Sequence, residues 1–198
     1  MARLRVTADG IDVSDAQEVT ALLAAAGVTY ERWEARSDLA DDASPDDILD
    51  AYGPQLEAVT AEGGYTTRDV IDLHPDVRGL EEMLARFNSE HWHDEDEVRF
   101  IVAGRGLFHI HADSGVLALE VEAGDFLRVP RGTLHWFDLC GNRRLRAIRL
   151  FQDKSGWTPH YTGSGVDAGF QPLCLGQSYI PLDAIAPVVS SPAGADDR

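Results

Sequence analysis

Two histidines and a glutamate are spaced so that a single metal ion could contact all three. One residue separates His91 from His93, and Glu97 follows four residues later. In an extended strand alternate side chains point to the same face, so His91 and His93 can point together into a barrel. Glu97 shares their parity and lies one short turn or extension away. Two imidazoles and a carboxylate suit a transition metal such as iron, nickel, cobalt, manganese or zinc.

A fourth ligand is expected from a second segment of the chain. His135 follows residues 124–132, which predict a strand bounded by turn residues that would return this histidine to the same barrel mouth. The two segments resemble the two halves of the cupin signature, His91-x-His93-x3-Glu97-x6-Gly104 and Gly124-x5-Pro130-x-Gly132-x2-His135. We therefore predict one metal centre built from His91, His93, Glu97 and His135.

The remaining histidines are weaker candidates for metal ligands. His109 and His111 share a face, but no carboxylate follows at the required spacing before the turn at residues 113–115. We interpret both as partly exposed strand residues. His74 and His160 are solitary in the sequence, and neither is predicted to bind a metal.

Two arginines are placed where a strand would turn them inward. Arg99 lies two residues past Glu97, hence on the face that lines the metal centre, and Arg149 interrupts the apolar run at residues 147–151. Burying an arginine is costly unless its charge meets an anion. That anion is either a structural carboxylate or a bound acidic substrate whose pKa the cation would lower. Both interpretations remain open at this point.

Other residues near the histidines are predicted as walls of the core or of a pocket. The aromatic members are Phe100, Phe108, Trp136, Phe137 and Trp157. Among them Phe137 shares the face of His135 and could pack against an apolar part of a substrate. The acids at 94–96 are predicted as a solvated loop that could contact the ligand histidines.

The elements that must position these residues differ along the chain. Residues 1–87 form a mixed part in which helices are predicted from Asp15, Pro45 and Asp76. Residues 88–162 are predicted as the metal-binding core, with short β-branched and aromatic runs at 98–103, 106–111, 116–120, 126–129 and 145–151. Residues 163–186 are expected to wrap back onto this core, and residues 187–198 to form a flexible tail. We predict one mainly β domain, a jelly-roll barrel with N-terminal helices packed against it.

The acidic composition limits the classes of partner. The chain carries 17 basic and 34 acidic side chains, for a formal net charge of −17, which argues against nucleic acid and anionic membranes. No apolar run approaches the roughly 18 residues that a membrane span needs. We expect a cytoplasmic protein in which Cys140 and Cys174 are reduced packing residues.

The residues around the ligands resemble the acireductone dioxygenase family, a family of metal-dependent cupins. The matching segments are residues 27–33, 51–52, 64–65, 69–73, 87–91, 97–100, 126–137, 147–151 and 156–157. They span about residues 20–162, whereas the first 18 residues and those past about 162 offer no distinctive match. The resemblance implies a cupin double-stranded β-helix that binds one Fe²⁺ or Ni²⁺ per chain through the four ligands named above.

The resemblance also implies roles for four neighbours of the metal. Arg99 matches an arginine that helps to form and hold the substrate dianion, and Arg149 matches a second active-site arginine. Glu90 and Asp96 match residues implicated in metal incorporation and in relaying local conformational change. A monomer is the oligomeric state that the resemblance favours.

The implied reaction belongs to methionine salvage. Its substrate is 1,2-dihydroxy-5-(methylthio)pent-1-en-3-one, a small ene-diol that reacts with O2. With iron the products would be 4-methylthio-2-oxobutanoate and formate. With nickel they would be 3-(methylthio)propanoate, formate and carbon monoxide.

Two other hypotheses use the same four ligands. One is another metal-dependent cupin enzyme, such as a different dioxygenase or an isomerase. The other is a non-catalytic cupin that binds a small molecule around a structural metal. The inward arginines argue against the second, and no helix-turn-helix pattern supports a regulator.

Overall fold

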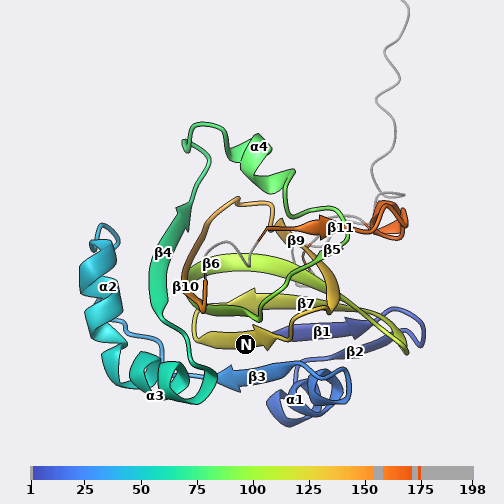
Figure 1. The fold of residues 1–198 in the computed structure, drawn as a ribbon, viewed down its shortest axis with the longest axis horizontal. Helices are drawn as coiled ribbons and strands as arrows, with labels where there is room; N and C mark the ends of the chain where they lie inside the picture. Colours follow the sequence, from blue (N-terminus) through green and yellow to red (C-terminus); the bar gives the residue numbers. More distant parts are fainter. Residues whose placement is uncertain (1, 154–157, 171–173, 175–198) are drawn as a thin grey trace, which may run out of the picture.

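The computed structural model describes residues 2–153, 158–170 and 174, and strands dominate this part of the chain (Figure 1). The strands are β1 (Arg3–Val6), β2 (Ile11–Val13), β3 (Thr29–Arg32), β4 (Thr67–Leu73), β5 (His91–Trp92), β6 (Glu97–Ala112), β7 (Gly115–Glu122), β8 (Asp125–Val129), β9 (Leu134–Leu139), β10 (Leu145–Phe151) and β11 (His160–Tyr161). The helices are α1 (Ala16–Ala25), α2 (Pro45–Ala51), α3 (Gly53–Gly63) and α4 (Leu80–Leu84), followed by the 3-10 turn η2 (Asp167–Gly169). The predicted fold class, mainly β with a few N-terminal helices, is confirmed.

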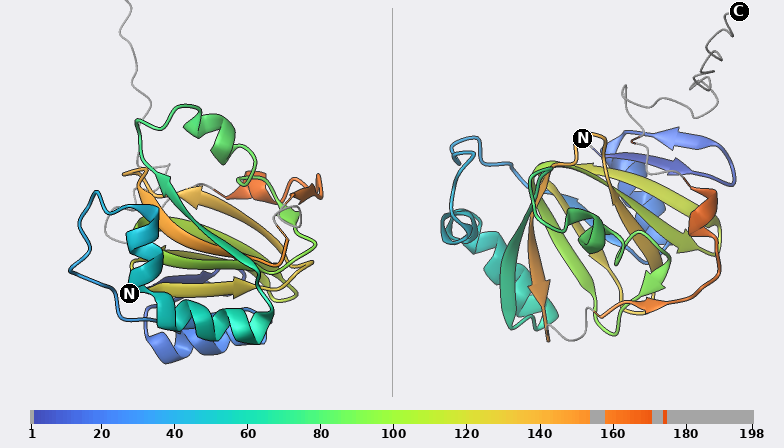
Figure 2. Two further views of the ribbon diagram at one scale, coloured as in Figure 1. Left: turned by 60° about the vertical axis from the view of Figure 1, so that its left-hand side comes forward. Right: turned by 90° about the horizontal axis from the view of Figure 1, so that it is seen from above.

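The long strand β6 joins two antiparallel sheets. Its first part pairs with β8 and β10, which extend to β3 and β4. Its second part pairs with β7 and β9, which extend to β1, β2, β5 and β11. The two sheets therefore face each other around an interior, as Figure 1 and the turned views of Figure 2 show.

A glycine in β6 changes which side chains point inward. Gly104 has φ of 81°, and a Cβ added there would lie 2.1 Å from the backbone oxygen of Arg144. Before it Ile101 belongs to the interior core, and beyond it Phe108 and Ile110 do, so the parity of inward residues has changed from odd to even. The sequence predicts two strands here. The structure has one strand with an irregularity in its pairing opposite residues 146–147.

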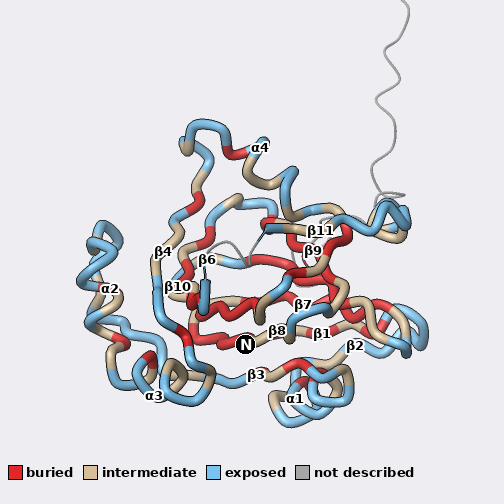
Figure 3. The backbone as a smooth tube through the Cα atoms, viewed as in Figure 1, coloured by how far each residue is buried: buried red, intermediate tan, exposed pale blue. Residues whose placement is uncertain are grey.

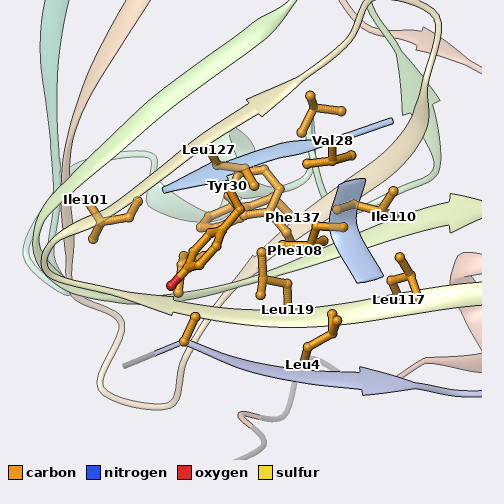
Figure 4. Close-up of a cluster of buried hydrophobic side chains, with 14 of the residues drawn as sticks. Leu4, Val28, Tyr30, Ile101, Phe108, Ile110, Leu117, Leu119, Leu127 and Phe137 are labelled. Atoms are coloured by element: carbon orange, nitrogen blue, oxygen red, sulfur yellow. The ribbon is translucent and has the colours of Figure 1, made fainter. Parts of the chain in front are cut away.

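The interior is filled by apolar side chains from both sheets. Figure 4 shows this cluster, in which Phe108 and Phe137 lie at the centre and Tyr30 and Leu127 come from the β3–β8 side. The buried positions follow the central strands, whereas α2 and α3 are largely exposed (Figure 3). A close-packed interior of this kind fixes the strands that carry the candidate ligands.

Helices α2 and α3 cover from outside the sheet that contains β3, β4, β8 and β10. Ile48, Tyr52 and Leu56 of the α2–α3 segment pack against Ile148 and Leu150 of β10, and Figure 2 shows both helices beside β4 and β10. The single helix predicted from Pro45 is split in two after residue 51. The reason is Pro54, which lacks an N–H and begins a new helix in its first turn.

The N-terminal part also supplies strands. Beyond the predicted helices it contributes the strands β1 to β4. Of these, β1 pairs with β7, β3 with β8 and β4 with β10, whereas β2 pairs with β1. These segments are short or lack a clean alternation in sequence, and their extended form depends on partners far along the chain. Most of the predicted wrap at 163–186, all of the tail at 187–198, and Trp157 lie outside the described residues.

Candidate metal centre

The four predicted ligands come together at one end of the interior. His91 lies in β5, His93 just after it, Glu97 begins β6 and His135 lies in β9. Each can offer one ligand atom, and these atoms all lie within 4.8 Å of one another. Direct pairing of His91 with His135 across β5 and β9 explains how segments more than 40 residues apart meet.

Backbone carbonyls orient the imidazole rings. Nδ1 of His91 lies 2.7 Å from the Ser89 oxygen, and Nδ1 of His135 lies 2.8 Å from the Thr133 oxygen. For His91 the carbonyl partner requires the proton on Nδ1, so the lone pair of its Nε2 faces the centre of the cluster. Nε2 of His91 is buried and has no hydrogen-bond partner among the described residues. A buried nitrogen that has no hydrogen-bond partner and lies beside three other potential ligand atoms is consistent with a metal-binding site.

Burial keeps His91 in the form that binds metals. Burial, together with the charge of the neighbouring His135, lowers the pKa of His91 to about 4. The ring is therefore neutral near pH 7. A neutral imidazole is the species that donates to a metal.

Glu97 supplies the negative charge of the cluster. Its Oε2 lies 2.8 Å from Nε2 of His135 and 3.3 Å from Nε2 of His93, and its Oε1 accepts a hydrogen bond from Nε of Arg99. Burial raises the pKa of Glu97, but Arg99 and His135 outweigh that effect and hold the pKa well below its usual range. The carboxylate is ionised and available as a ligand.

Comparison with known proteins shows where else such a chain, with three imidazoles and one carboxylate clustered in a β-barrel, is found. A model of the ARD/ARD′ family matches residues 9–159 of this chain. The chain belongs to the ARD/ARD′ family.

Relatives in the ARD/ARD′ family resemble the chain over most of its length. A protein of Xanthomonas euvesicatoria pv. vesicatoria named acireductone dioxygenase is 42% identical over 176 residues, which is 86% of this chain and 94% of the relative. One from Synechococcus sp., with the same name, is 44% identical over 155 residues, or 78% and 86% of the two chains. The solved structure of an acireductone dioxygenase from Bacillus anthracis with a cadmium ion in its active center superposes with a TM-score of 0.74 at 34% identity, covering 81% and 98%. The resemblance predicted from the sequence is confirmed.

The two arginines of this ARD/ARD′ family member both have carboxylate partners. Arg99 is 4% exposed and is bonded to Glu97. Arg149 is half-buried and donates from Nε and Nη2 to Asp69, with both distances 2.9 Å. The structural ion pair and the substrate-binding interpretation are therefore compatible, because a guanidinium group has five N–H donors and can contact a carboxylate and an anionic substrate together.

Both arginines also line a small, mainly apolar cavity next to the cluster. Its other walls are Ile71 and Leu73 of β4, Met83 and Leu84 of α4, Phe87 and Phe137. Phe137 thus lies where the sequence predicts a pocket wall, and its ring centroid is 5.3 Å from Cζ of Arg99. The cavity volume of about 20 Å³ is room for a single water molecule.

Sequence reasoning missed the contributions of β4 and α4 to this cavity. Ile71 and Met83 reach the cavity, and Asp69 contacts its wall residue Arg149, only because β4 pairs with β10 and α4 follows β4. The one available signal is Asp69, an acid at the start of a β-branched run. A single acid in a strand is too common to predict a site.

Glu90 and Asp96 hold the loops that carry the ligands. Buried Glu90 accepts hydrogen bonds from Thr162 and Ser164, both at 2.5 Å, and lies 2.6 Å from Nδ1 of His111. Burial raises the pKa of Glu90, but these partners outweigh it and lower the pKa overall. Asp96 accepts from Tyr65 and from the backbone N–H of Arg131.

The remaining histidines lie outside the cluster, but one prediction about them is wrong. His109 is 2% exposed and stacks on Trp136 with ring centroids 4.7 Å apart, so it is not partly exposed. The parity change at Gly104 turns it to the outer face, where Phe170 covers it. His74 is near Asp76, and His160 bonds to Asp94.

The prediction of two reduced cysteines is also wrong. Cys140 and Cys174 form a disulfide, with their Cα atoms 5.5 Å apart. The sequence did not indicate this pairing because the two cysteines are 34 positions apart, and it depends on the segment after β11 returning to the end of β9. Glu120 lies near both sulfurs.

Proposed function

We propose that this ARD/ARD′ family member is an acireductone dioxygenase that cleaves 1,2-dihydroxy-5-(methylthio)pent-1-en-3-one with O2. The observation that carries the proposal is that Arg99 and Arg149 line one apolar cavity beside the histidine–glutamate cluster. An ene-diol is a weak acid that ionises more readily near cations. The relatives named acireductone dioxygenase support the same activity.

The proposed metal ligands are His91, His93, Glu97 and His135, binding one Fe²⁺ or Ni²⁺. The neutral His91 and the ionised Glu97 support this, and nitrogen and oxygen donors suit both metals. When bound, the ion would supply Lewis-acid chemistry and a template for the ene-diol oxygens. Iron and nickel would lead to the two product sets given above.

The side chains of the protein would bind and orient the substrate anion. Arg99 and Arg149 would lower the pKa of the ene-diol and hold its oxygens at the metal end of the cavity. Phe137, Met83 and Ile71 would contact the methylthio tail and exclude water. Because the cavity holds only about 20 Å³, the α4 side chains must move to admit a substrate.

Glu90 and Asp96 are proposed to support metal incorporation indirectly. Each lies next to a ligand in sequence and holds a neighbouring segment through its hydrogen bonds. Their loss would loosen the segments that carry His91 and Glu97.

A product analysis tests the proposed function. Metal-free protein is loaded anaerobically with Fe²⁺ or Ni²⁺, the ene-diol is added, and air is admitted. We expect formate above the spontaneous background in both, with the keto acid in the iron form and carbon monoxide in the nickel form. Absence of metal-dependent product would overturn the proposal and favour a different cupin activity.

Two further proposals concern the state of the protein in the cell. We propose a monomer, which gel filtration would test at micromolar concentration. We also propose the cytoplasm, which cell fractionation followed by immunoblotting would test. None of the described helices is long and apolar enough to cross a membrane.

A further inference from the structure

Three neighbouring strands place two carboxylates and two arginines in one row. Arg149 on β10 has Asp69 on β4 as its Cα partner on one side and Arg99 on β6 on the other. Directly paired residues of adjacent antiparallel strands project from the same face of a sheet. Arg99 in turn bonds to Glu97, so the row reads Asp69, Arg149, Arg99, Glu97.

The two inner members of this row repel each other. Burial lowers the pKa of Arg99, and the charge of Arg149 lowers it further, although Glu97 opposes both effects. Two guanidinium groups stay side by side only where carboxylates balance them. Asp69 provides that balance for Arg149 with two hydrogen bonds of 2.9 Å.

The charges of the row cancel when no metal is bound. A divalent ion at the cluster would leave two positive charges, which a dianionic substrate would neutralise. The bidentate pairing with Asp69 also fixes the plane of the Arg149 guanidinium, so its remaining N–H groups keep one direction.

We propose that Asp69 is a positioning residue of the active site, which holds Arg149 beside Arg99 so that both guanidinium groups face the anionic substrate. This inference rests on the proposed function. Asp69 acts through Arg149, so its loss should weaken substrate binding more than it slows the bound reaction.

The same two strands offer a matched control. Asp72 on β4 and Arg146 on β10 are also direct partners, joined by hydrogen bonds of 2.8 and 2.5 Å. They lie three residues from Asp69 and Arg149, on the opposite face of the sheet, and Arg146 also donates to the backbone oxygen of Asp41. Asp72→Ala therefore breaks a similar ion pair away from the cavity.

The test compares Asp69→Ala, Asp69→Glu and Asp72→Ala as Ni²⁺-loaded proteins. We expect Asp69→Ala to raise KM about 10-fold and to change kcat less. The reason is that Arg149 loses its charge-assisted hydrogen bonding to Asp69 and is no longer held in place. The acid limb of the kcat/KM profile should move to higher pH, because the ene-diol ionises less readily. The anaerobic Kd of the ene-diol, measured by calorimetry, should rise in parallel.

The other variants distinguish a positioning role of Asp69 from a general effect on the stability of the protein. Asp69→Glu restores a carboxylate and should recover part of the affinity, and Asp72→Ala should keep the wild-type KM and pH profile. If Asp69→Ala does not fold, Asp69→Asn keeps one acceptor and should give a rise of about 3-fold. Unchanged KM and pH profile in the Asp69 variants, or equal changes in Asp72→Ala, would overturn the inference. An inactive wild-type protein would instead overturn the proposed function, and this inference with it.

Discussion

Each imidazole at the metal centre is fixed by a contact on its far side. His91 and His135 have backbone carbonyls at Nδ1, and His135 also contacts Glu97 through Nε2. The clustering of the four candidate ligands could be predicted from sequence because their spacing reflects strand periodicity. Asp69 could not, since its place beside Arg149 depends on the register between β4 and β10.

Removing one ligand should remove the metal. We expect His135→Ala to bind Fe²⁺ or Ni²⁺ at least ~10-fold more weakly than the wild type, because loss of even an indirect partner of a ligand costs that much. Elemental analysis after desalting measures the stoichiometry. His109→Phe is the control, a buried histidine that stacks on Trp136 outside the cluster. Stoichiometric metal in His135→Ala would show that the ligand set is wrong.

Removing the buried arginine should separate metal binding from turnover. Arg99→Ala leaves all four proposed ligands in place but removes a donor aimed into the cavity. We expect metal to be retained and kcat/KM to fall roughly 100-fold, the effect of losing one preorganised donor. Metal content and steady-state kinetics are measured on the same preparation. Parallel loss of metal and turnover would assign Arg99 a structural role only.

At the scale of elements, β6 shows where sequence patterns fail. Alternation predicts its two halves separately, but not that Gly104 reverses the inward face between them. That reversal explains why Glu97 and Arg99 point inward while His109 points out. The strands β1 to β4 were not predicted because their extended form comes from long-range pairing.

The segment after β11 is tied to the outer face of β9. Phe170 packs on Trp136 and the Cys140–Cys174 disulfide closes the segment. We expect reduction to lower the free energy of unfolding by about 3–4 kcal/mol, since the bond closes a loop of intermediate length. Urea denaturation with and without dithiothreitol measures this, with Cys174→Ser as the variant that should not respond. Identical urea midpoints for the oxidised and reduced wild type would contradict a stabilising role of the disulfide.

A half-buried carboxyl under the same segment, that of Asp138, predicts a pH dependence. Burial, together with the nearby charge of Asp167, raises the pKa of Asp138 to about 6 from an ordinary 3.8. The folded state therefore holds this proton more tightly than the unfolded state, and its contribution to stability is lost as pH rises from 4 to 6.

Asp138→Asn isolates this contribution. Its free energy of unfolding should exceed that of the wild type by roughly 1–3 kcal/mol above pH 6, and the difference should vanish near pH 4. Thermal or urea unfolding across this range gives the comparison. A difference that does not change with pH would contradict the assignment.

At the scale of the whole molecule, the net charge of −17 lowers the stability of the folded state. Acidic side chains outnumber basic ones two to one, so repulsion between them opposes the compact state. We expect Tm to rise when NaCl is increased from about 0.05 to 0.5 M, because the Debye length falls below the spacing of most surface charges. Calorimetry at both salt concentrations checks this, and a falling Tm would mean that surface ion pairs dominate.

The central claim is that oxidation of the ene-diol depends on a metal ion held by His91, His93, Glu97 and His135. The most direct test measures formate produced per minute against bound metal, in samples of metal-free protein loaded to increasing fractions with Fe²⁺. We predict a straight line that rises from the spontaneous background and stops rising at one metal per chain. Formate production that is independent of bound metal, or that continues to rise beyond one ion per chain, would contradict it.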